Sequence, residues 1–164
     1  MKQYSMLVGT LAIFCLAGGS SWGQTTDSPM ANTLYAELGG SAGFVYNVGY
    51  DRLLYTNGRN KLAVAAGFQY LPTGQSIPVH VSFSPQISYL LGRLNHLELG
   101  VGTIHSTGER NSTAATLRIG YRYQRPDGGT FFKIGFTPIL FGVEIFGETL
   151  PVFPWGGFAF GWTF

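Results

Sequence analysis

Large apolar side chains recur at every second position through most of this chain, from Asn32 to its C terminus. Successive side chains of a β-strand point to opposite faces, so a two-residue period is typical of strands rather than helices. Beyond the N-terminal segment, no run approaches the roughly 18 consecutive apolar residues that mark a membrane-spanning helix. The alternation therefore predicts an all-β fold.

Turn-forming residues divide the alternation into about eight strands. Asn57-Gly58 is a strong hairpin signal, and the segment from Pro126 to Gly129 supplies the special backbone angles of a turn. Pro85 interrupts one strand and predicts a bulge there. The expected strands cover residues 32–40, 44–55, 62–70, 77–91, 96–102, 115–124, 131–137 and 157–164.

The two faces of these strands differ in a way that a water-soluble sheet does not explain. One face is large and aromatic almost throughout, whereas the other is rich in the chain's 24 glycines and carries scattered polar residues. Charged residues make up only 11% of the chain, against about 25% in ordinary soluble domains. Small residues relieve crowding inside a narrow closed sheet, and an apolar outside suits lipid. We expect a closed antiparallel up-and-down β-barrel of about eight strands that crosses a membrane.

Five charged residues share the face expected to line the barrel interior. Opposite charges in a narrow, poorly hydrated space must pair or carry a large desolvation penalty, so we interpret them as a salt-bridge network that plugs the barrel. The alternative is a charged lining of a conducting pore, although barrels of this size usually fill their interiors with side chains. The five residues are Glu37, Glu98, Arg118, Arg122 and Lys133.

The first 23 residues have the pattern of a cleaved signal peptide. Lys2 gives a positive start, residues 6–17 form an apolar run, and Ser21 and Gly23 are the small residues that signal peptidase requires. An apolar run of about 12 residues is too short to cross a bilayer as a helix. We expect cleavage after Gly23, so that residues 24–164 form the barrel domain. The only cysteine, Cys15, would leave with the signal, which excludes a disulfide framework and a thiolate site.

The connections between the strands predict an orientation. Short turns at 56–60, 92–95 and 125–129 fall on the side of both termini, and longer loops at 71–78, 103–113 and 140–154 fall on the other side, as in bacterial outer-membrane barrels. The loop at 140–154 is unusually apolar. It is expected to fold over the barrel mouth or to meet a partner, and the alternative is that its flanks extend the last two strands.

The last residues of the chain resemble the C-terminal assembly signal of bacterial outer-membrane proteins, which end in an aromatic residue preceded by alternating apolar ones. Phe158, Phe160, Trp162 and Phe164 match that pattern. In architecture the chain is similar to the small OmpA-like and OmpX-like barrels. Its segments Glu37-Leu-Gly-Gly, Gly120-Tyr-Arg-Tyr and Pro154-Trp-Gly-Gly resemble an uncharacterised barrel family of Bacteroidota.

The resemblance implies export to the bacterial outer membrane, contact with outer-membrane lipids, folding by the barrel assembly machinery and recognition of Phe164. It implies no reaction, because this architecture hosts structural proteins, adhesins and lipid enzymes alike. The net charge of +2 indicates no nucleic-acid surface, and the sequence indicates no cofactor.

One pair of residues raises the possibility of catalysis. His80 and Ser82 lie two positions apart on one strand, close enough for an imidazole to activate a hydroxyl, and Glu98 could orient the imidazole. The pair is similar to the His-x-Ser arrangement of barrel lipid A deacylases, but Phe83 stands where that motif has asparagine. A polar inward face that contains histidine and serine by chance is the commoner explanation, and His96 and His105 are too scattered to form a metal site.

Three classes of function follow in falling order. The first is a non-enzymatic outer-membrane barrel with a structural or surface-interaction role, the second a small channel, and the third a lipid-modifying enzyme of the lipid A deacylase type.

Overall fold

The computed structural model describes residues 32–41, 45–71, 80–107, 112–145 and 148–164. The predicted signal peptide and the predicted mature N terminus, Gln24, lie outside these residues, as does most of the 71–78 loop. Within the described ranges, the chain contains no helix that is long and apolar enough to cross a membrane.

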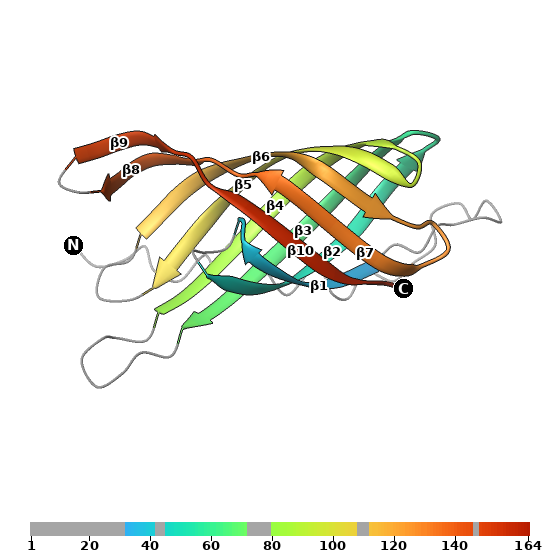
Figure 1. The fold of residues 1–164 in the computed structure, drawn as a ribbon, viewed down its shortest axis with the longest axis horizontal. Coiled ribbons are helices and arrows are strands. Elements are labelled where there is room, and N and C mark those ends of the chain that lie inside the picture. The colour runs from blue at the N-terminus through green and yellow to red at the C-terminus, as the bar shows by residue number, and fades with distance from the viewer. Residues whose placement is uncertain (1–31, 42–44, 72–79, 108–111, 146–147) are drawn as a thin grey trace, which may run out of the picture.

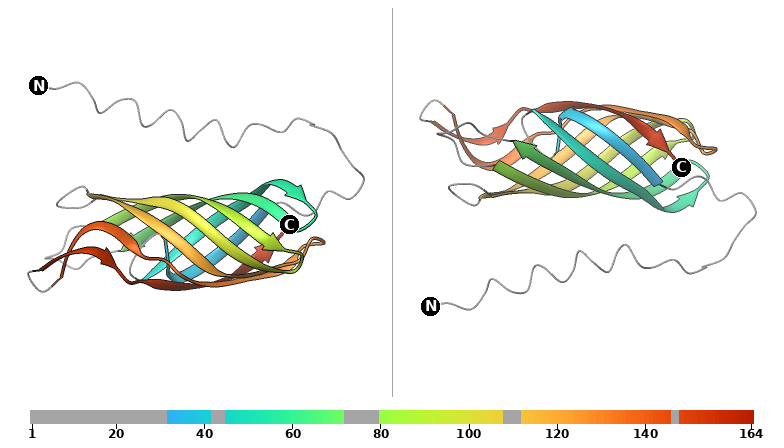
Figure 2. Two further views of the ribbon diagram at one scale, coloured as in Figure 1. Left: turned by 90° about the horizontal axis from the view of Figure 1, so that it is seen from above. Right: turned by 90° about the horizontal axis from the view of Figure 1, so that it is seen from below.

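Ten β-strands make up the described chain, and all their pairings are antiparallel (Figure 1). Each strand pairs with its neighbours, and the β1–β10 and β5–β6 pairings close the sheet into a tube (Figure 2). The strands are β1 Asn32–Gly39, β2 Tyr46–Asn57, β3 Asn60–Leu71, β4 His80–Gly92, β5 Asn95–Thr107, β6 Ser112–Gln124, β7 Gly129–Phe136, β8 Ile139–Ile145, β9 Glu148–Phe153 and β10 Gly156–Thr163.

The ten strands occupy eight positions around the barrel, because the last two positions are each interrupted. β7 and β8 both pair with β6 and are separated by Thr137 and Pro138. β9 and β10 are separated by Pro154 and Trp155, and hydrogen bonds from Leu117 N to Pro138 O and from Thr137 N to Trp155 O bridge the interruptions. The predicted eight-stranded closed up-and-down barrel is therefore confirmed.

Two predicted outer loops are wrong in extent. β5 and β6 continue through Thr107 and from Ser112, with Thr103 paired to Ala115. The polar residues of this stretch do not end the strands, because strand pairing uses backbone groups whatever the side chains are. Most of the 140–154 segment likewise forms the β8–β9 hairpin, so its flanks extend the last two strands, as the alternative expectation predicted. Contact of this segment with a partner stays a prediction.

The predicted bulge at Pro85 is also wrong. Pro85 pairs in register with Ala66 of β3, and the β4–β5 register is the same on both sides of it. The register shifts lie instead in β8, between Leu140 and Val143, and in β2, between Leu53 and Tyr55, where the extra residue Leu54 is exposed. An extra residue on one strand makes two consecutive side chains depart from the alternation.

The barrel has an apolar outside and a polar inside. Exposed large hydrophobic residues occur on every one of its eight positions, among them Leu34, Val48, Phe68, Ile87, Val101 and Ile119. The buried side chains of the described residues are mostly polar or charged. Six of the eight buried apolar residues form two small clusters, one of Tyr35, Phe131 and Ala159 and one of Leu53, Ala63 and Leu90.

Glycines make room for Tyr35, the one tyrosine that is buried among the described residues. Tyr35 pairs in register with Gly49 on β2 and with Gly161 on β10. A Cβ atom at Gly49 would lie 2.1 Å from Cζ of Tyr35, and one at Gly161 would lie 2.6 Å from its Cβ. The glycine-rich face thus lets a large ring lie flat inside a narrow barrel.

Candidate functional site

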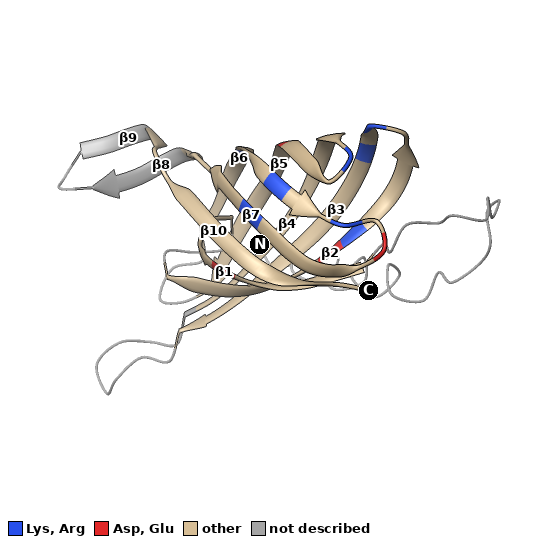
Figure 3. Cartoon of the chain, turned by 45° about the vertical axis from the view of Figure 1, so that its right-hand side comes forward, with Lys and Arg blue, Asp and Glu red and all other residues tan. Residues whose placement is uncertain are grey.

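The barrel interior contains all five residues of the predicted charge network. Figure 3 marks the Lys and Arg positions of the strands in blue and the Asp and Glu positions in red. Glu37 extends from β1, Glu98 from β5, Arg118 and Arg122 from β6, and Lys133 from β7. Each is at most 1% exposed, and Arg118, Arg122 and Lys133 are among the four largest fully buried side chains of the described chain. Each of them is separated by an even number of positions from other inward residues of its strand, so the alternation directs its side chain into the barrel.

Arg118 lies between the two glutamates. Its Nη1 donates a 2.7 Å hydrogen bond to Oε1 of Glu37, and its Nε lies 3.6 Å from Oε2 of Glu98. The other oxygen of Glu98 accepts hydrogen bonds from Ser88 at 3.0 Å and from Gln86 at 3.3 Å. One cation therefore compensates two carboxylates, and neutral donors bind one oxygen of the second, whose Oε2 accepts no hydrogen bond from the described residues.

Lys133 is held by aromatic rings rather than by hydrogen bonds. Its Nζ lies 3.9 Å from the ring centroid of Tyr35 and 6.0 Å from that of Phe131, and it has no hydrogen-bond partner within the described part of the chain. A desolvated ammonium over an aromatic face is stabilised by the ring quadrupole, by about 2 kcal/mol in buried cases.

Arg122 forms a second, separate pair with Asp51 of β2. Its Nη1 and Nη2 donate hydrogen bonds of 2.8 and 2.6 Å to the two oxygens of this carboxylate, a bidentate geometry. Nε and Nη2 also donate to Gln124, whose amide nitrogen donates to Thr33 at 3.1 Å. All three nitrogens of the Arg122 guanidinium thus donate hydrogen bonds to buried side chains.

Asp51 is the network residue that sequence reasoning missed. The alternation does place it on the inward face, two positions after Gly49, but it was assigned no partner. Charge balance was the available signal, because two glutamates against three cations leave one positive charge uncompensated. Asp51 supplies a third buried carboxylate opposite Arg118, Arg122 and Lys133. A fourth buried cation, Lys61, lies nearer the turns and donates a 3.1 Å hydrogen bond to the backbone oxygen of Arg93.

Two of the three weak catalytic candidates, Ser82 and Glu98, lie far apart along the barrel. Ser82 is buried and shares a 2.9 Å hydrogen bond with Ser106 of β5. The backbone of Glu98 pairs with Leu90 of β4. Leu90 is eight residues from Ser82 along this strand, which separates their backbones by roughly 27 Å. His80 is the first residue of β4, and its side chain lies outside the described part of the structure.

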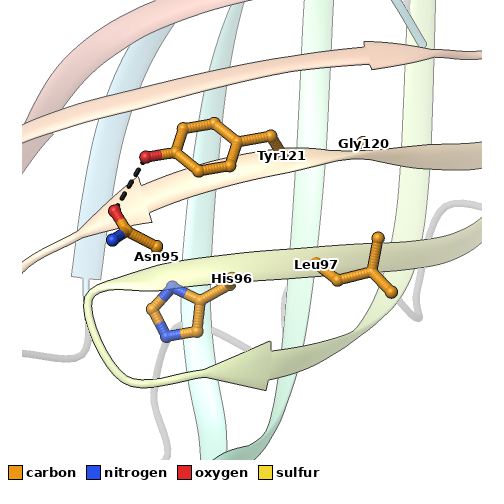
Figure 4. A pocket seen from close by; sticks show the side chains of 5 residues that line it. All are labelled: Asn95, His96, Leu97, Gly120 and Tyr121. Atoms are coloured by element: carbon orange, nitrogen blue, oxygen red, sulfur yellow. Dashed lines mark hydrogen bonds between the residues drawn. The ribbon is translucent and has the colours of Figure 1, made fainter.

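Nothing in the described residues offers a metal site, since no group of three or more His, Cys, Asp or Glu side chains converges there. His96 is buried at the turn end of β5, whereas His105 is exposed and bonded to Thr103 and Thr113. A shallow hollow on the wall is lined by five residues of β5 and β6, where Tyr121 donates a 2.7 Å hydrogen bond to Asn95 (Figure 4). These are Asn95, His96, Leu97, Gly120 and Tyr121.

The four residues of the predicted assembly signal are all exposed. Phe158, Phe160 and Trp162 face outward from β10, and Phe164 directly follows this strand. Phe158, Phe160, Trp162 and Phe164 are 41% to 60% exposed. Phe158 contacts Phe132 edge-on, with 5.1 Å between ring centroids. A band of outward aromatic residues therefore runs the length of the last strand.

Neither a protein-family model nor a curated protein sequence matches this chain. The eight-stranded closed barrel is consistent with the architecture of the small OmpA-like and OmpX-like barrels. Membership of a Bacteroidota family stays a prediction from three short sequence segments.

Proposed function

We propose that this chain is a small integral outer-membrane β-barrel with a plugged interior and a structural or surface-interaction role. The observation that carries the proposal is the reversed polarity of the barrel: large apolar residues outside, and paired charges inside. In water this outside would be one continuous apolar patch, which monomeric soluble proteins avoid. In lipid it is the surface that the hydrocarbon favours.

The interior supports a plug rather than a pore. Buried cations and carboxylates bridge strands on opposite sides of the barrel, as in the Arg118–Glu37 pair between β6 and β1 and the Arg122–Asp51 pair between β6 and β2. Each bridge removes free volume from the lumen and fixes long side chains in place. A conducting pore needs a hydrated lining instead, so the channel is the less favoured alternative.

The proposed surface contact is the β8–β9 hairpin. β8 pairs with β6 only through Ile139 and Leu140, so the rest of the hairpin extends beyond the neighbouring strand (Figure 1). Deleting residues 144–150 should abolish the capture of a surface partner by this protein, while the barrel itself still folds.

Fractionation of the source cells tests the membrane assignment. The protein should appear in the outer-membrane fraction with Gln24 as its first residue, and its gel mobility should change on heating, since a folded barrel migrates differently from its unfolded chain. A soluble protein with heat-insensitive mobility would overturn the proposal. Planar-bilayer recordings then separate the plug from the channel, because the plugged barrel should give no defined single-channel steps.

A further inference from the structure

Tyrosine–asparagine pairs fasten the end of the barrel at which the short turns lie. Tyr50 donates a 2.7 Å hydrogen bond to the side-chain oxygen of Asn32, and Tyr89 donates one of 2.9 Å to Asn60. Tyr121 makes the same 2.7 Å bond to Asn95 (Figure 4). We call these three pairs the Tyr–Asn clasps.

The clasps repeat one register. Each asparagine is the first residue of an odd-numbered strand, and the leucine two positions later pairs directly with the tyrosine of the next strand: Leu34 with Tyr50, Leu62 with Tyr89 and Leu97 with Tyr121. The covalent turns at this end join β2 to β3, β4 to β5 and β6 to β7. Clasps and turns therefore alternate around the rim.

Basic residues gather at the same end. Arg59, Arg93 and Arg125 are exposed in the three turns, and the half-buried Arg52 pairs in register with Asn32. The exposed acid described at this end is Asp127, whose hydrogen bond with Arg125 lowers the pKa of the carboxyl and satisfies that arginine. Arg52, Arg59 and Arg93 have no carboxylate partner among the described residues.

This arrangement defines a recognition surface. The apolar band ends in a row of tyrosine hydroxyls, and three unpaired guanidinium groups lie at or beyond it. Because the tyrosines occupy the asparagine oxygens, the group that each asparagine keeps for an outside ligand is its amide NH2, a donor. Apolar surface, then neutral donors, then positive charge is the order in which a lipid presents acyl chains, ester oxygens and an anionic phosphate.

We propose that the rim formed by the Tyr–Asn clasps with Arg52, Arg59 and Arg93 binds the headgroups of anionic glycerophospholipids. This inference rests on the proposed membrane location, and it adds a ligand class and a set of binding residues to it. Charge complementarity selects the ligand, because zwitterionic headgroups carry no net charge for the three arginines to neutralise.

Trp162 provides a built-in probe. It is 60% exposed, and it pairs in register with Leu34, two residues after Asn32 of the first clasp. Expression of the full-length gene with Trp22→Phe and Trp155→Phe leaves Trp162 as the only tryptophan. The purified protein is reconstituted in phosphatidylcholine vesicles that contain an equal mole fraction of acyl-brominated phosphatidylglycerol or acyl-brominated phosphatidylcholine, and fluorescence quenching gives the relative binding constant of the two lipids.

The quenching reports the lipid next to Trp162, and there the anionic lipid should bind about fivefold more tightly through Arg52, which pairs in register with Asn32 of the adjoining β1. The variant Arg52→Gln/Arg59→Gln/Arg93→Gln should lower the ratio to about one, whereas the matched variant Arg52→Lys/Arg59→Lys/Arg93→Lys should keep most of it. High salt should remove the preference in the wild type. A ratio of one in the wild type, or an unchanged ratio in the glutamine variant, would overturn this inference alone.

Heat-modifiable gel mobility is measured on every sample. A protein that folds in the vesicles but shows no lipid preference leaves the proposed function standing. A protein that folds in neither kind of vesicle would overturn the proposed function itself.

Discussion

Arg122 and Asp51 lie 71 residues apart in the sequence and meet inside the barrel through two hydrogen bonds of 2.6 and 2.8 Å. Both side chains are at most 1% exposed. A buried pair of this kind contributes little compared with well-packed apolar residues, but removing one partner leaves an uncompensated buried charge.

Asp51→Asn should therefore destabilise the barrel by about 3–5 kcal/mol. The midpoint of urea unfolding in detergent micelles, followed by gel mobility, measures the change. The double variant Asp51→Leu/Arg122→Met removes both charges and should recover most of the loss. A single variant as stable as the wild type would show that the pair is not desolvated.

Removing the central pair should open the barrel to ions. In Arg118→Ser/Glu37→Ser the lumen loses two long side chains while its net charge is unchanged, so planar-bilayer recordings should show single-channel steps that the wild type lacks. The matched control, Arg59→Ser/Asp127→Ser, removes opposite charges from exposed turns and should behave as the wild type. Equal conductance in all three proteins would contradict the plug.

Gly49→Ala should destabilise the barrel by about 1–3 kcal/mol, because its new methyl group would overlap the Tyr35 ring. Thermal unfolding, read as the temperature at which gel mobility changes, measures the loss. Gly156→Ala is a control with more room, since the nearest atom to its Cβ would be Gly135 O at 3.2 Å. Combining Gly49→Ala with Tyr35→Leu should restore part of the stability.

Phe164→Ala should reduce the amount of folded barrel in cells while leaving refolding into detergent unchanged, because the proposed recognition of the C-terminal aromatic residue acts during assembly. Quantitative blotting of heated and unheated outer membranes measures the cellular effect. Phe68→Ala, an equally outward phenylalanine on β3, is the control. Equal losses in both variants would point to stability rather than recognition.

Ser82→Ala should leave the lipid A profile of the cells unchanged, since the Ser82 hydroxyl is buried against Ser106 and Glu98 lies far along the barrel. Mass spectrometry of extracted lipid A is the measurement. Loss of one acyl chain in the wild type that is restored in the variant would revive the enzyme hypothesis.

The sequence predicts well those features that depend on neighbours along one strand. The two-residue period placed Glu37, Glu98 and Lys133 inside because each side chain's face follows from its strand alone. It failed where a strand departs from regularity, as at Leu54, and where polar residues such as Thr103 continue a strand instead of ending it. The bulge predicted at Pro85 was wrong for a related reason. A backbone N–H bonds to only one of the two neighbouring strands, so the proline, which lacks it, leaves the pairing in register.

The sequence by itself determined that this chain forms a closed barrel with an apolar outside and a charged inside, because alternation and turn residues are local properties. Only the tertiary structure decided which charges meet. Glu37 and Arg118 are 81 residues apart, and their contact depends on the register of every strand between them. The clasps at the rim have the same origin, since an asparagine at a strand start gains a tyrosine partner only when the neighbouring strand sets the register.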